Sequence, residues 1–401
     1  MKSRSEEFEE WGTEVIFGRA KGFRAAMMRV VLRGASWLFR LVVLARLYLF
    51  HSSIARQARL GMLVVSVGNI TVGGTGKTPV VELLARTLTL RGRKVAILTR
   101  GYKSAELDKP QELRDKDGRL PENLPKIASD GKTRYLSPLY SGDEPFMLAK
   151  NLDGVAVLVD KNRIKSGIFA IEHLGCDTLL LDDGMQYLKL AHELDIVLVD
   201  CGAPFGTGAM LPRGTLREPR SSLARASYII LTKCGGKPQD ELISAIRKYN
   251  PVADIIVSDH GPRYLENVFT GERLPLKALR GKWVACLSGI ARPESFENSL
   301  RSLGAHVEIC RRFPDHHWFE QTELQEFYDR CADRAMDMIV TTEKDAVRLE
   351  KPEEDPEVPI YFLRIEVEIY QGREAWERCV DRICGISEPR PRDEWQPSSS
   401  F

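Results

Sequence analysis

Val64-Val65-Ser66-Val67-Gly68-Asn69-Ile70-Thr71-Val72-Gly73-Gly74-Thr75-Gly76-Lys77-Thr78-Pro79 is the stretch that decides the fold of this chain. Its first residues are apolar and mostly β-branched, as in a buried strand, and a glycine-rich turn follows them. The turn ends in Gly-Lys-Thr and leads into residues 80–90, whose apolar spacing is helical. A strand, a glycine loop and a helix in this order predict a phosphate-binding loop.

The chemistry of such a loop comes from its backbone. Successive N–H groups can surround phosphate oxygens at the start of a helix, where the helix dipole favours negative charge. We expect Lys77 to reach the β- and γ-phosphates of a nucleotide and the Thr78 hydroxyl to bind Mg²⁺. The residues of this loop that we expect to bind the nucleotide are Thr71, Gly73, Gly74, Thr75, Gly76, Lys77 and Thr78.

One position departs from the strict pattern G-x-x-x-x-G-K-[ST]. Thr71 stands where that pattern has glycine, although Gly68, Gly73 and Gly74 lie close by. The alternative is a glycine turn between a strand and a helix that binds nothing. Three glycines followed by Lys-Thr in this context favour a nucleotide site.

The composition limits the class of protein. A chain of 401 residues has room for two or three domains, and its net charge of +2 gives no argument for a nucleic-acid partner. The eight cysteines form no Cys-x-x-Cys pair, and several lie inside apolar runs. This pattern predicts buried free thiols in a reducing compartment rather than a disulfide framework or a zinc site.

The N-terminal region contains an amphipathic helix. The apolar stretch 27–50 carries four arginines, so it is too interrupted to be a spanning helix. On a helical projection, one face carries Arg29, Arg33, Ser36 and Arg40, and the opposite face carries Met27, Val31, Leu38, Val42, Ala45 and Leu49. This pattern predicts a helix that lies in a membrane interface. The alternative is a helix that packs its apolar face on the core of the protein itself.

The rest of the chain reads as α/β. Six apolar runs, separated in several places by helical stretches, predict buried parallel strands of a doubly wound sheet. The runs cover residues 63–67, 94–98, 155–159, 178–181, 195–199 and 228–232. Residues 250–277 contain two strand-like pieces that suit a linker or a hairpin. A second α/β pattern follows, with strands expected at 283–288 and 338–342 and a helix at 293–303.

Three further segments carry chemistry. Strand 178–182 ends in Asp182-Asp183-Gly184, and an acidic strand end is the form expected of a Mg²⁺ site, although one aspartate could instead cap a helix. Which of the two serves the metal stays open. The loop 211–219 contains two arginines and a glutamate, and arginine can hold phosphate with two hydrogen bonds. The segment Thr232-Lys233-Cys234-Gly235 lacks the aspartate that would bind guanine, which favours ATP over GTP.

Taken together, these segments resemble the tetraacyldisaccharide 4′-kinase family, the lipid A 4′-kinases, over residues 27–386. The motifs that carry the resemblance are Val67-Gly68-Asn69 with Gly76-Lys77-Thr78, Thr99-Arg100-Gly101-Tyr102, Gly142-Asp143-Glu144-Pro145, Leu181-Asp182-Asp183-Gly184-Met185-Gln186, Leu211 to Pro219, and Phe313-Pro314-Asp315-His316. This chain has Met185-Gln186-Tyr187 where the family usually has Phe-Gln-His.

The resemblance implies transfer of the ATP γ-phosphate to the 4′-hydroxyl of a tetraacyldisaccharide 1-phosphate, at the cytoplasmic face of a bacterial inner membrane. It implies Asp143, in a loop beside Glu144, as the catalytic carboxylate, His316 as its partner from the second domain, and Lys77 as the phosphate-binding lysine. Because His316 lies in the second domain, we expect the pair to assemble only when the two domains close. The expected metal ligands are Thr78, Asp182, Asp183 and Glu218; Gln186 and Arg217 are expected to contact the nucleotide, and Asn69, Tyr102, Glu144 and Arg163 the lipid substrate.

The expected architecture is a P-loop NTPase-like α/β/α sandwich with a second, smaller α/β domain and an N-terminal membrane-interface helix. The regions are 1–60 (interface helix), 61–248 (P-loop kinase domain), 249–277 (two-stranded linker), 278–386 (smaller domain) and 387–401 (disordered tail). We expect ATP and Mg²⁺ as cofactors, a monomer, no nucleic-acid partner, and contact with the membrane through the N-terminal helix.

Two rival functions remain at this stage. One is another P-loop enzyme such as a metallochaperone-like GTPase, which the glycine at position 235 and the lack of a Cys-x-x-Cys pair disfavour. The other is a nucleotide-gated membrane adaptor without catalysis, which gives no reason for Asp143 and His316.

Overall fold

The computed structural model describes residues 4–101, 124–352 and 356–385. These residues form two compact units. Unit 1 comprises the described residues within 1–100, 162–259 and 368–401, and unit 2 comprises those within 101–161 and 260–367. The chain passes from one unit to the other four times, and two of these passages lie inside the long strands β8 (Asp254–Asn267) and β13 (Ile360–Gln371).

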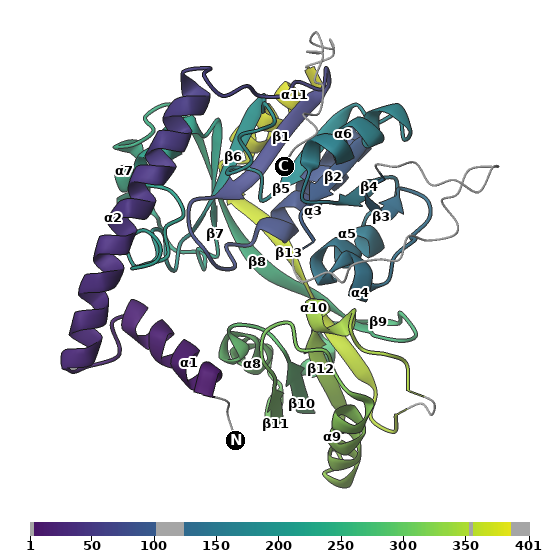
Figure 1. Cartoon of the computed structure of the whole chain (residues 1–401). Coiled ribbons are helices and arrows are strands. Elements are labelled where there is room, and N and C mark those ends of the chain that lie inside the picture. The colour runs from purple at the N-terminus through teal and green to yellow at the C-terminus, as the bar shows by residue number, and fades with distance from the viewer. Residues whose placement is uncertain (1–3, 102–123, 353–355, 386–401) are drawn as a thin grey trace. The chain divides into compact units, whose positions relative to one another are not determined.

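Unit 1 is built on a parallel sheet with β1 (Leu63–Asn69) at its centre (Figure 1). On one side of β1 the order continues with β5 (Thr178–Asp182) and β2 (Val95–Thr99); on the other side it continues with β6 (Leu194–Asp200), β7 (Tyr228–Thr232) and the first part of β8. Every residue of β1, β2, β5 and β7 is buried, as expected for parallel strands covered on both faces. The strands predicted at 63–67, 94–98, 178–181, 195–199 and 228–232 are confirmed.

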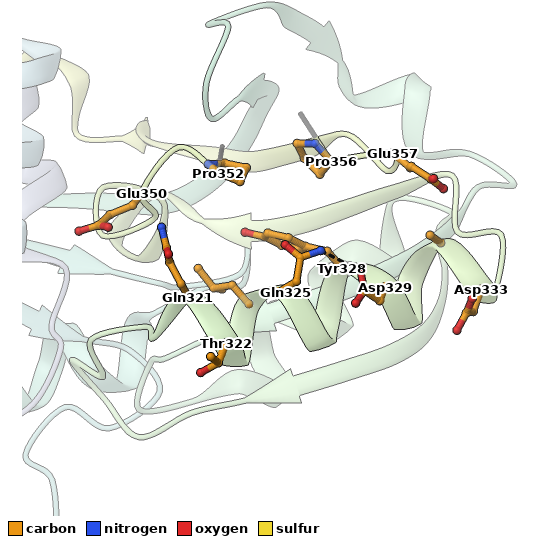
Figure 2. A pocket seen from close by; sticks show the side chains of 12 residues that line it. Gln321, Thr322, Gln325, Tyr328, Asp329, Asp333, Glu350, Pro352, Pro356 and Glu357 are labelled. Atoms are coloured by element: carbon orange, nitrogen blue, oxygen red, sulfur yellow. Dashed lines mark hydrogen bonds between the residues drawn. The ribbon is translucent and has the colours of Figure 1, made fainter. Parts of the chain in front are cut away.

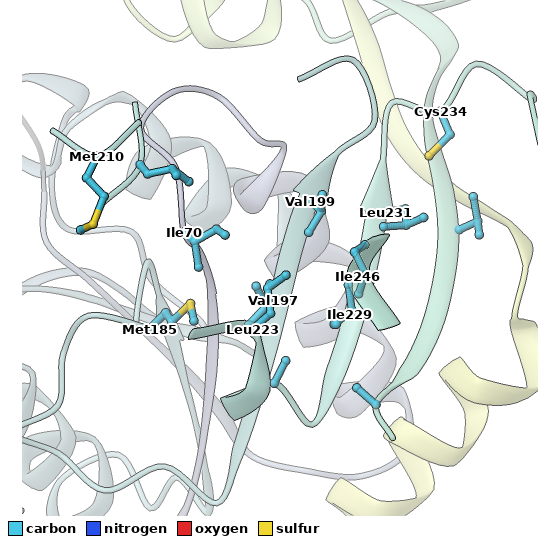
Figure 3. Packing of buried hydrophobic residues seen from close by; sticks show 14 residues of the cluster. Ile70, Met185, Val197, Val199, Met210, Leu223, Ile229, Leu231, Cys234 and Ile246 are labelled. Carbon is cyan, nitrogen blue, oxygen red and sulfur yellow. The ribbon is translucent and has the colours of Figure 1, made fainter. Parts of the chain in front are cut away.

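Helices cover this sheet because their apolar stripes need burial. The helices of unit 1 that follow α2 are α3 (Lys77–Leu90), α6 (Arg163–Glu172), α7 (Asp240–Arg247) and α11 (Arg373–Gly385). Figure 3 shows one face of the sheet, where Val197 and Val199 of β6 and Ile229 and Leu231 of β7 pack near Ile246 of α7. On α6, Gly167 allows close approach to the sheet, because a Cβ there would lie 2.4 Å from Leu60 Cδ1.

Cys201 and Cys234 form a disulfide. The expectation that the cysteines are free thiols is therefore wrong for this pair. The cause is the parallel register of β6 and β7, which pairs Asp200 with Thr232 and so brings the residues just after the two strand ends together. Such a pairing depends on which strands are neighbours, and spacing along the sequence does not reveal it. The other six cysteines, all within the described part of the chain, are free.

The N-terminal region of unit 1 contains α1 (Arg4–Ile16) and the long α2 (Phe23–His51), which Figure 1 shows as the longest helix. Ser36 is buried on the face of α2 that contacts the unit, and its hydroxyl donates to the Met210 carbonyl at 2.9 Å. Phe39 and Val43 also pack toward the core of unit 1. The apolar face opposite is exposed and includes Met27, Val30, Val31, Leu38, Leu41 and Val42. The alternative that this face packs on the protein core is therefore wrong.

No helix in the described ranges combines the length and the apolar character that crossing a membrane requires.

In unit 2, β10 (Trp283–Ser288) lies between β11 (His306–Arg312) and β12 (Met338–Thr342), with β13 beside β12, and these pairings are all parallel. Side chains of β10 alternate between the two faces. Ala285 and Leu287 join a cluster with Phe327 of α9 (Gln321–Asp333), whereas Val284 and Cys286 join a cluster with Phe296 of α8 (Pro293–Ser302). The strands predicted at 283–288 and 338–342 and the helix at 293–303 are confirmed; β11 and β13 were not predicted.

Residues 124–161 of unit 2 differ from the expectation. The run at 155–159 forms β4 (Ala156–Val159), but β4 pairs antiparallel with β3 (Lys126–Asp130), a strand hidden in the polar stretch before it. Two short helices follow β3, α4 (Pro138–Ser141) and α5 (Asp143–Asn151). The expected linker is a hairpin of β8 with β9 (Arg273–Pro275).

The contact-based units do not coincide with the domain ranges expected from the sequence. Residues 124–161 group with unit 2 rather than with the P-loop, and α11 groups with unit 1 through contacts such as the ion pair between Arg91 and Glu377 at 2.9 Å. The sequence-based ranges remain a prediction. The expected disordered tail lies outside the described residues.

Candidate active site

The glycine loop has the conformation that anion binding requires. Gly73 and Gly76 have φ values of 110° and 79°, in the left-handed region that favours glycine. Gly76 is the residue before α3, so the helix begins at Lys77 and directs its free N–H groups toward the loop. The Thr75 hydroxyl is buried and has no hydrogen-bond partner among the described residues. A phosphate oxygen in the loop would supply that partner.

Lys77 lies between two oxygen-bearing side chains. Its Nζ is 3.3 Å from Asn69 Oδ1 and 3.5 Å from Asp183 Oδ1. Asn69 is fully buried and also donates to the Thr71 carbonyl at 2.9 Å. The lysine is therefore held over the loop by groups that a triphosphate could replace.

Asp183 and Arg217 form an ion pair with two hydrogen bonds. Nη1 and Nη2 of Arg217 lie 2.7 Å and 2.8 Å from the two carboxylate oxygens of Asp183, and Nη2 also donates to Asn69. Burial tends to raise the pKa of Asp183, but the hydrogen bonds from Arg217 and the charge of Lys77 outweigh it and lower this pKa to about 2. Asp183 is thus ionised at neutral pH, and its backbone φ of 55° is a left-handed value uncommon outside glycine.

Asp182 ends β5 with a buried side chain, and it accepts a hydrogen bond from the Thr99 hydroxyl at 3.3 Å. Thr78, also buried, lies in the first turn of α3. No group of three or more His, Cys, Asp or Glu side chains in the described ranges is arranged to hold a metal ion. Mg²⁺ is usually bound through one or two carboxylates together with phosphate oxygens and water, so a hydroxyl and one or two carboxylates fit that ion.

Glu218 and Gln186 lie together on another side of the loop. Gln186 Nε2 donates to Glu218 Oε1 and to the Asn69 carbonyl, both at 3.0 Å. Glu218 is buried and forms an ion pair with Arg225 at 2.9 Å. This pairing was not predicted, and it fixes the position of the Glu218 carboxylate beside Gln186.

Arg163 begins α6 and is buried, with its guanidinium 5.1 Å from the centre of the Tyr187 ring. Burial lowers the pKa of Arg163, while Tyr187, Asp182 and Asp183 oppose this effect through their charges. The arginine therefore lies within electrostatic range of the acidic end of β5.

Unit 2 brings Asp143 and His316 together. His316 Nδ1 lies 2.9 Å from Asp143 Oδ2, and Asp143 is buried. The expected loop at Asp143 and Glu144, with a pair that forms only on domain closure, is not found. Instead, the two acidic residues begin α5, where carboxylates favour the helix N-terminus, and Asp143 meets His316 within one unit.

Two residues near this pair were missed by the sequence reading. Lys344 Nζ lies 3.0 Å from His316 Nε2 and 3.0 Å from Asp315 Oδ1. Arg348 is buried and its Nε lies 3.6 Å from Asp143 Oδ2. Both residues follow the carboxyl end of strand β12. Charged residues after a buried strand often lie at a binding site, so this pattern could have identified them as candidates.

Lys233 was considered only for guanine recognition. The structure places its Nζ 3.0 Å from Asp200 Oδ2 and in contact with the Gly74 carbonyl, and the adjacent Thr232 hydroxyl donates to the Thr75 carbonyl at 2.8 Å. The end of β7 therefore supports the glycine loop.

The structure thus assembles two groups of predicted residues. Unit 1 contains Asn69, Thr71, Gly73, Gly74, Thr75, Gly76, Lys77, Thr78, Arg163, Asp182, Asp183, Gln186, Arg217 and Glu218; unit 2 contains Asp143, Glu144 and His316. Tyr102 lies outside the described residues.

A separate hollow of about 710 Å³ lies beside α9 in unit 2 (Figure 2). None of the predicted site residues lines it. Its charged side chains are all acidic, namely Asp329, Asp333, Glu350 and Glu357. Carboxylates repel phosphate, so this hollow does not suit a nucleotide.

Comparison with known proteins gives a consistent result. A family model described as tetraacyldisaccharide-1-P 4′-kinase matches residues 28–384. The tetraacyldisaccharide 4′-kinase of Anaeromyxobacter sp. (strain K) is 39% identical over 387 residues, which cover 95% of this chain and 98% of that protein. The chain belongs to the tetraacyldisaccharide 4′-kinase family. It is therefore a phosphotransferase, and the resemblance drawn from its motifs is confirmed.

Other family members agree. The tetraacyldisaccharide 4′-kinase of Syntrophus aciditrophicus (strain SB) is 37% identical over 358 residues, covering 86% of this chain and 90% of that protein. The crystal structure of LpxK from Aquifex aeolicus in complex with ATP matches with a TM-score of 0.67 at 27% identity, covering 89% of this chain and 99% of that one. The P-loop kinase-like α/β fold expected from the sequence is confirmed, and the kinase interpretation is supported over the GTPase and adaptor alternatives.

Proposed function

We propose that the chain transfers the γ-phosphate of ATP to the 4′-hydroxyl of a tetraacyldisaccharide 1-phosphate, with Asp143 as the base. The observation that carries the proposal is Lys77, which begins α3 directly after the glycine loop and lies 3.3 Å from Asn69 and 3.5 Å from Asp183. Membership of the kinase family and the ATP bound in the Aquifex aeolicus relative support the choice of nucleotide.

The nucleotide phosphates would displace the present partners of Lys77. The ammonium would exchange its contacts with Asn69 and Asp183 for oxygens of the β- and γ-phosphates, while the N–H groups of the loop surround the same oxygens. Arg217 would stay beside the phosphates, because its two hydrogen bonds to Asp183 and its contact with Asn69 fix its guanidinium. Gln186 would be oriented in the same way by Glu218.

Thr78 and Asp182 would hold Mg²⁺, with Asp183 or Glu218 available as further oxygen donors. Mg²⁺ neutralises charge that develops on the transferring phosphoryl group. Asp182 ends β5 and accepts a hydrogen bond from Thr99, whereas Asp183 is paired with Arg217 and Glu218 with Arg225.

Asp143 would accept the proton of the sugar hydroxyl. Phosphoryl transfer has a loose transition state, so the hydroxyl needs to lose its proton only late in the reaction, and a carboxylate is sufficient. His316 would fix the orientation of this carboxylate through the 2.9 Å hydrogen bond. Glu144 and Arg163 remain candidates for contact with the lipid headgroup, as does Tyr102, which lies outside the described residues.

The membrane surface at the cytoplasmic face is the proposed second partner. The outward face of α2 exposes large apolar side chains, among them Val30 at 69% and Leu38 at 65% exposed, on a helix that also carries several arginines. This combination supports an orientation in the plane of the interface. We further propose that the chain acts as a monomer.

A lipid phosphorylation assay tests the function. Purified chain, Mg-ATP and a tetraacyldisaccharide 1-phosphate in neutral detergent should yield the bisphosphate. K77M should abolish the product and weaken ATP binding, whereas K237M, at an exposed lysine outside the site, should leave both unchanged. ATP hydrolysis without lipid product in the parent chain would contradict the proposed acceptor.

A further inference from the structure

A second hollow, of about 700 Å³, lies between α2 and the loop 207–221 in unit 1. Four arginines line it, and no acidic side chain does. We call it the arginine hollow and define it by Arg33 and Arg40 of α2 and by Arg213 and Arg220 of the loop. It is distinct from the glycine loop, since neither Lys77 nor Thr78 lines it.

The placement of these arginines is unusual for surface cations. Arg33 and Arg40 flank Ser36, whose buried hydroxyl faces the unit, so both side chains project along the inner side of α2 rather than from its exposed apolar face. In the described part of the chain none of the four guanidinium groups has a carboxylate partner within ion-pair distance, although Arg217, Arg225, Arg348 and Arg364 of the same chain do.

Three of the four arginines have contacts that leave their charge uncompensated. Arg40 lies over the Trp37 ring, 5.9 Å from the ring centre. Arg213 donates to the Ile16 carbonyl at 3.0 Å, and its buried Nε has no hydrogen-bond partner among the described residues. Arg220 lies over the Phe205 ring at 4.5 Å from the ring centre. Four positive charges that converge without a counterion favour binding of an anion.

The remaining lining is amphipathic. It includes the large side chains of Trp37, Met210, Leu216 and Tyr249 together with small polar residues. The hollow opens beside the helix whose outer face is apolar, at the level where lipid headgroups lie if α2 rests in the interface. Guanidinium groups bind phosphate with two parallel hydrogen bonds, which suits a phosphodiester better than a point charge would.

We propose that the arginine hollow binds the phosphodiester headgroup of an anionic membrane phospholipid, which is not the substrate. The inference rests on the proposed membrane contact of α2. We assign the bound phosphodiester to bulk membrane lipid because α2 exposes its apolar face along its length. Acyl chains and their headgroups would therefore surround this helix. Occupancy would fix α2 against the loop 207–221, which also contains Arg217 and Glu218 of the candidate active site.

The test uses the full chain and a soluble probe. Dihexanoylphosphatidylglycerol, kept below its micelle concentration, is titrated while the fluorescence of Trp37 is followed; W37F identifies the part of the signal that comes from this residue. We expect saturable binding that R33Q/R40Q weakens at least about tenfold, since each basic contact with anionic lipid contributes about fivefold. R24Q, at an exposed arginine of α2 outside the hollow, should leave the affinity unchanged.

Further arms separate the alternatives. Dihexanoylphosphatidylcholine should bind much more weakly, because its choline group meets four positive charges. Equal affinity of the two lipids, or equal loss in R24Q and R33Q/R40Q, would overturn the proposal. R33Q/R40Q changes exposed side chains, so its fold should persist; circular dichroism and a thermal melt check this.

Steady-state turnover in neutral detergent without phospholipid tests whether the hollow binds the substrate phosphate instead of a phospholipid headgroup. If R33Q/R40Q raises KM for the tetraacyldisaccharide 1-phosphate and leaves phosphatidylglycerol binding intact, the hollow holds the substrate and the proposal is wrong. The titration needs no catalysis, so failure of the kinase function and failure of this inference give different results.

Discussion

The Nδ1 atom of His316 lies 2.9 Å from Asp143 Oδ2, although 173 residues separate them in the chain. On the other side of the ring, Lys344 Nζ lies 3.0 Å from Nε2. An ammonium can only donate, so Nε2 accepts and Nδ1 carries the proton that is donated to Asp143. The lysine thereby selects the tautomer that donates to the carboxylate and orients it. The positive φ of His316, 65°, is a second sign that the site constrains this residue.

Replacement of either member of the pair should reduce turnover. D143N removes the base and should lower kcat by about 10²–10⁴-fold, the usual range for general base catalysis, with little change in ATP affinity. H316N should have a smaller effect of the same kind. H317N is a matched control, because His317 pairs with Glu323 instead. Equal losses of kcat and ATP affinity in D143N would contradict the assigned role.

K344M should change the tautomer of His316. The variant removes the donor to Nε2, so the tautomer that carries its proton on Nε2 becomes more populated. Charged groups in contact with the ring are Asp143 at Nδ1 and Lys344 at Nε2, with Asp315 Oδ1 3.9 Å from Nε2; Arg348 contacts Asp143. Nitrogen-15 NMR of labelled histidine measures the change directly. An unchanged His316 spectrum with reduced kcat would show that Lys344 acts elsewhere.

The Arg217–Asp183 pair predicts a pH-dependent contribution to stability. The pKa of Asp183 is lowered from 3.8 to about 2 in the folded chain. The pair therefore stabilises the fold at pH values above the pKa of the unfolded state, 3.8, and this stabilisation is lost as the pH falls toward 2. The stability difference between the parent chain and R217M should therefore shrink between about pH 5 and pH 3. Urea unfolding at several pH values measures it, and a difference that stays constant over this range would refute the assignment.

The variant D183N, which lacks the carboxylate, provides a control for that prediction. In D183N the replacement R217M should have no pH dependence of its own in this range, because the neutral amide cannot titrate. This double-mutant comparison removes contributions from other acidic groups.

Gly68 should not tolerate a side chain. A Cβ at this position would lie 2.6 Å from Met185 Cβ and 2.8 Å from the Met185 backbone nitrogen. G68A should thus cost about 1–3 kcal/mol, the usual range for overpacking. G74A is a matched control, because a Cβ at Gly74 meets no atom within 4 Å. Thermal unfolding compares the two variants, and equal stability of both would disprove the steric argument.

The sequence predicted the parts of the fold that are coded locally. The β-branched run before Gly68 and the helical spacing after Lys77 specify strand, loop and helix within a few residues of each other, and the structure follows them. The same holds for the acidic end of β5. These features depend on neighbours along the chain, so periodicity and glycine placement are sufficient to find them.

Features that depend on strand order could not be predicted. The Cys201–Cys234 bond, the contact of Lys233 with the glycine loop and the pairing of β3 with β4 all follow from which strands lie side by side. Lys344 and Arg348 belong to the same class, because their role appears only once β12 is placed in unit 2 near α5. Asp143 and His316 were named through motifs, but their direct contact was not expected without closure.

The four passages of the chain between the two units have a consequence for synthesis and for dissection. Unit 1 draws on three separate segments, and its last helix, α11, ends at Gly385 and contacts α3 through Arg91. A ribosome therefore has to synthesise the chain through α11 before the nucleotide-binding half can complete its packing. For the same reason, no single cut in the gene separates the halves, and early nonsense mutations leave both unfinished.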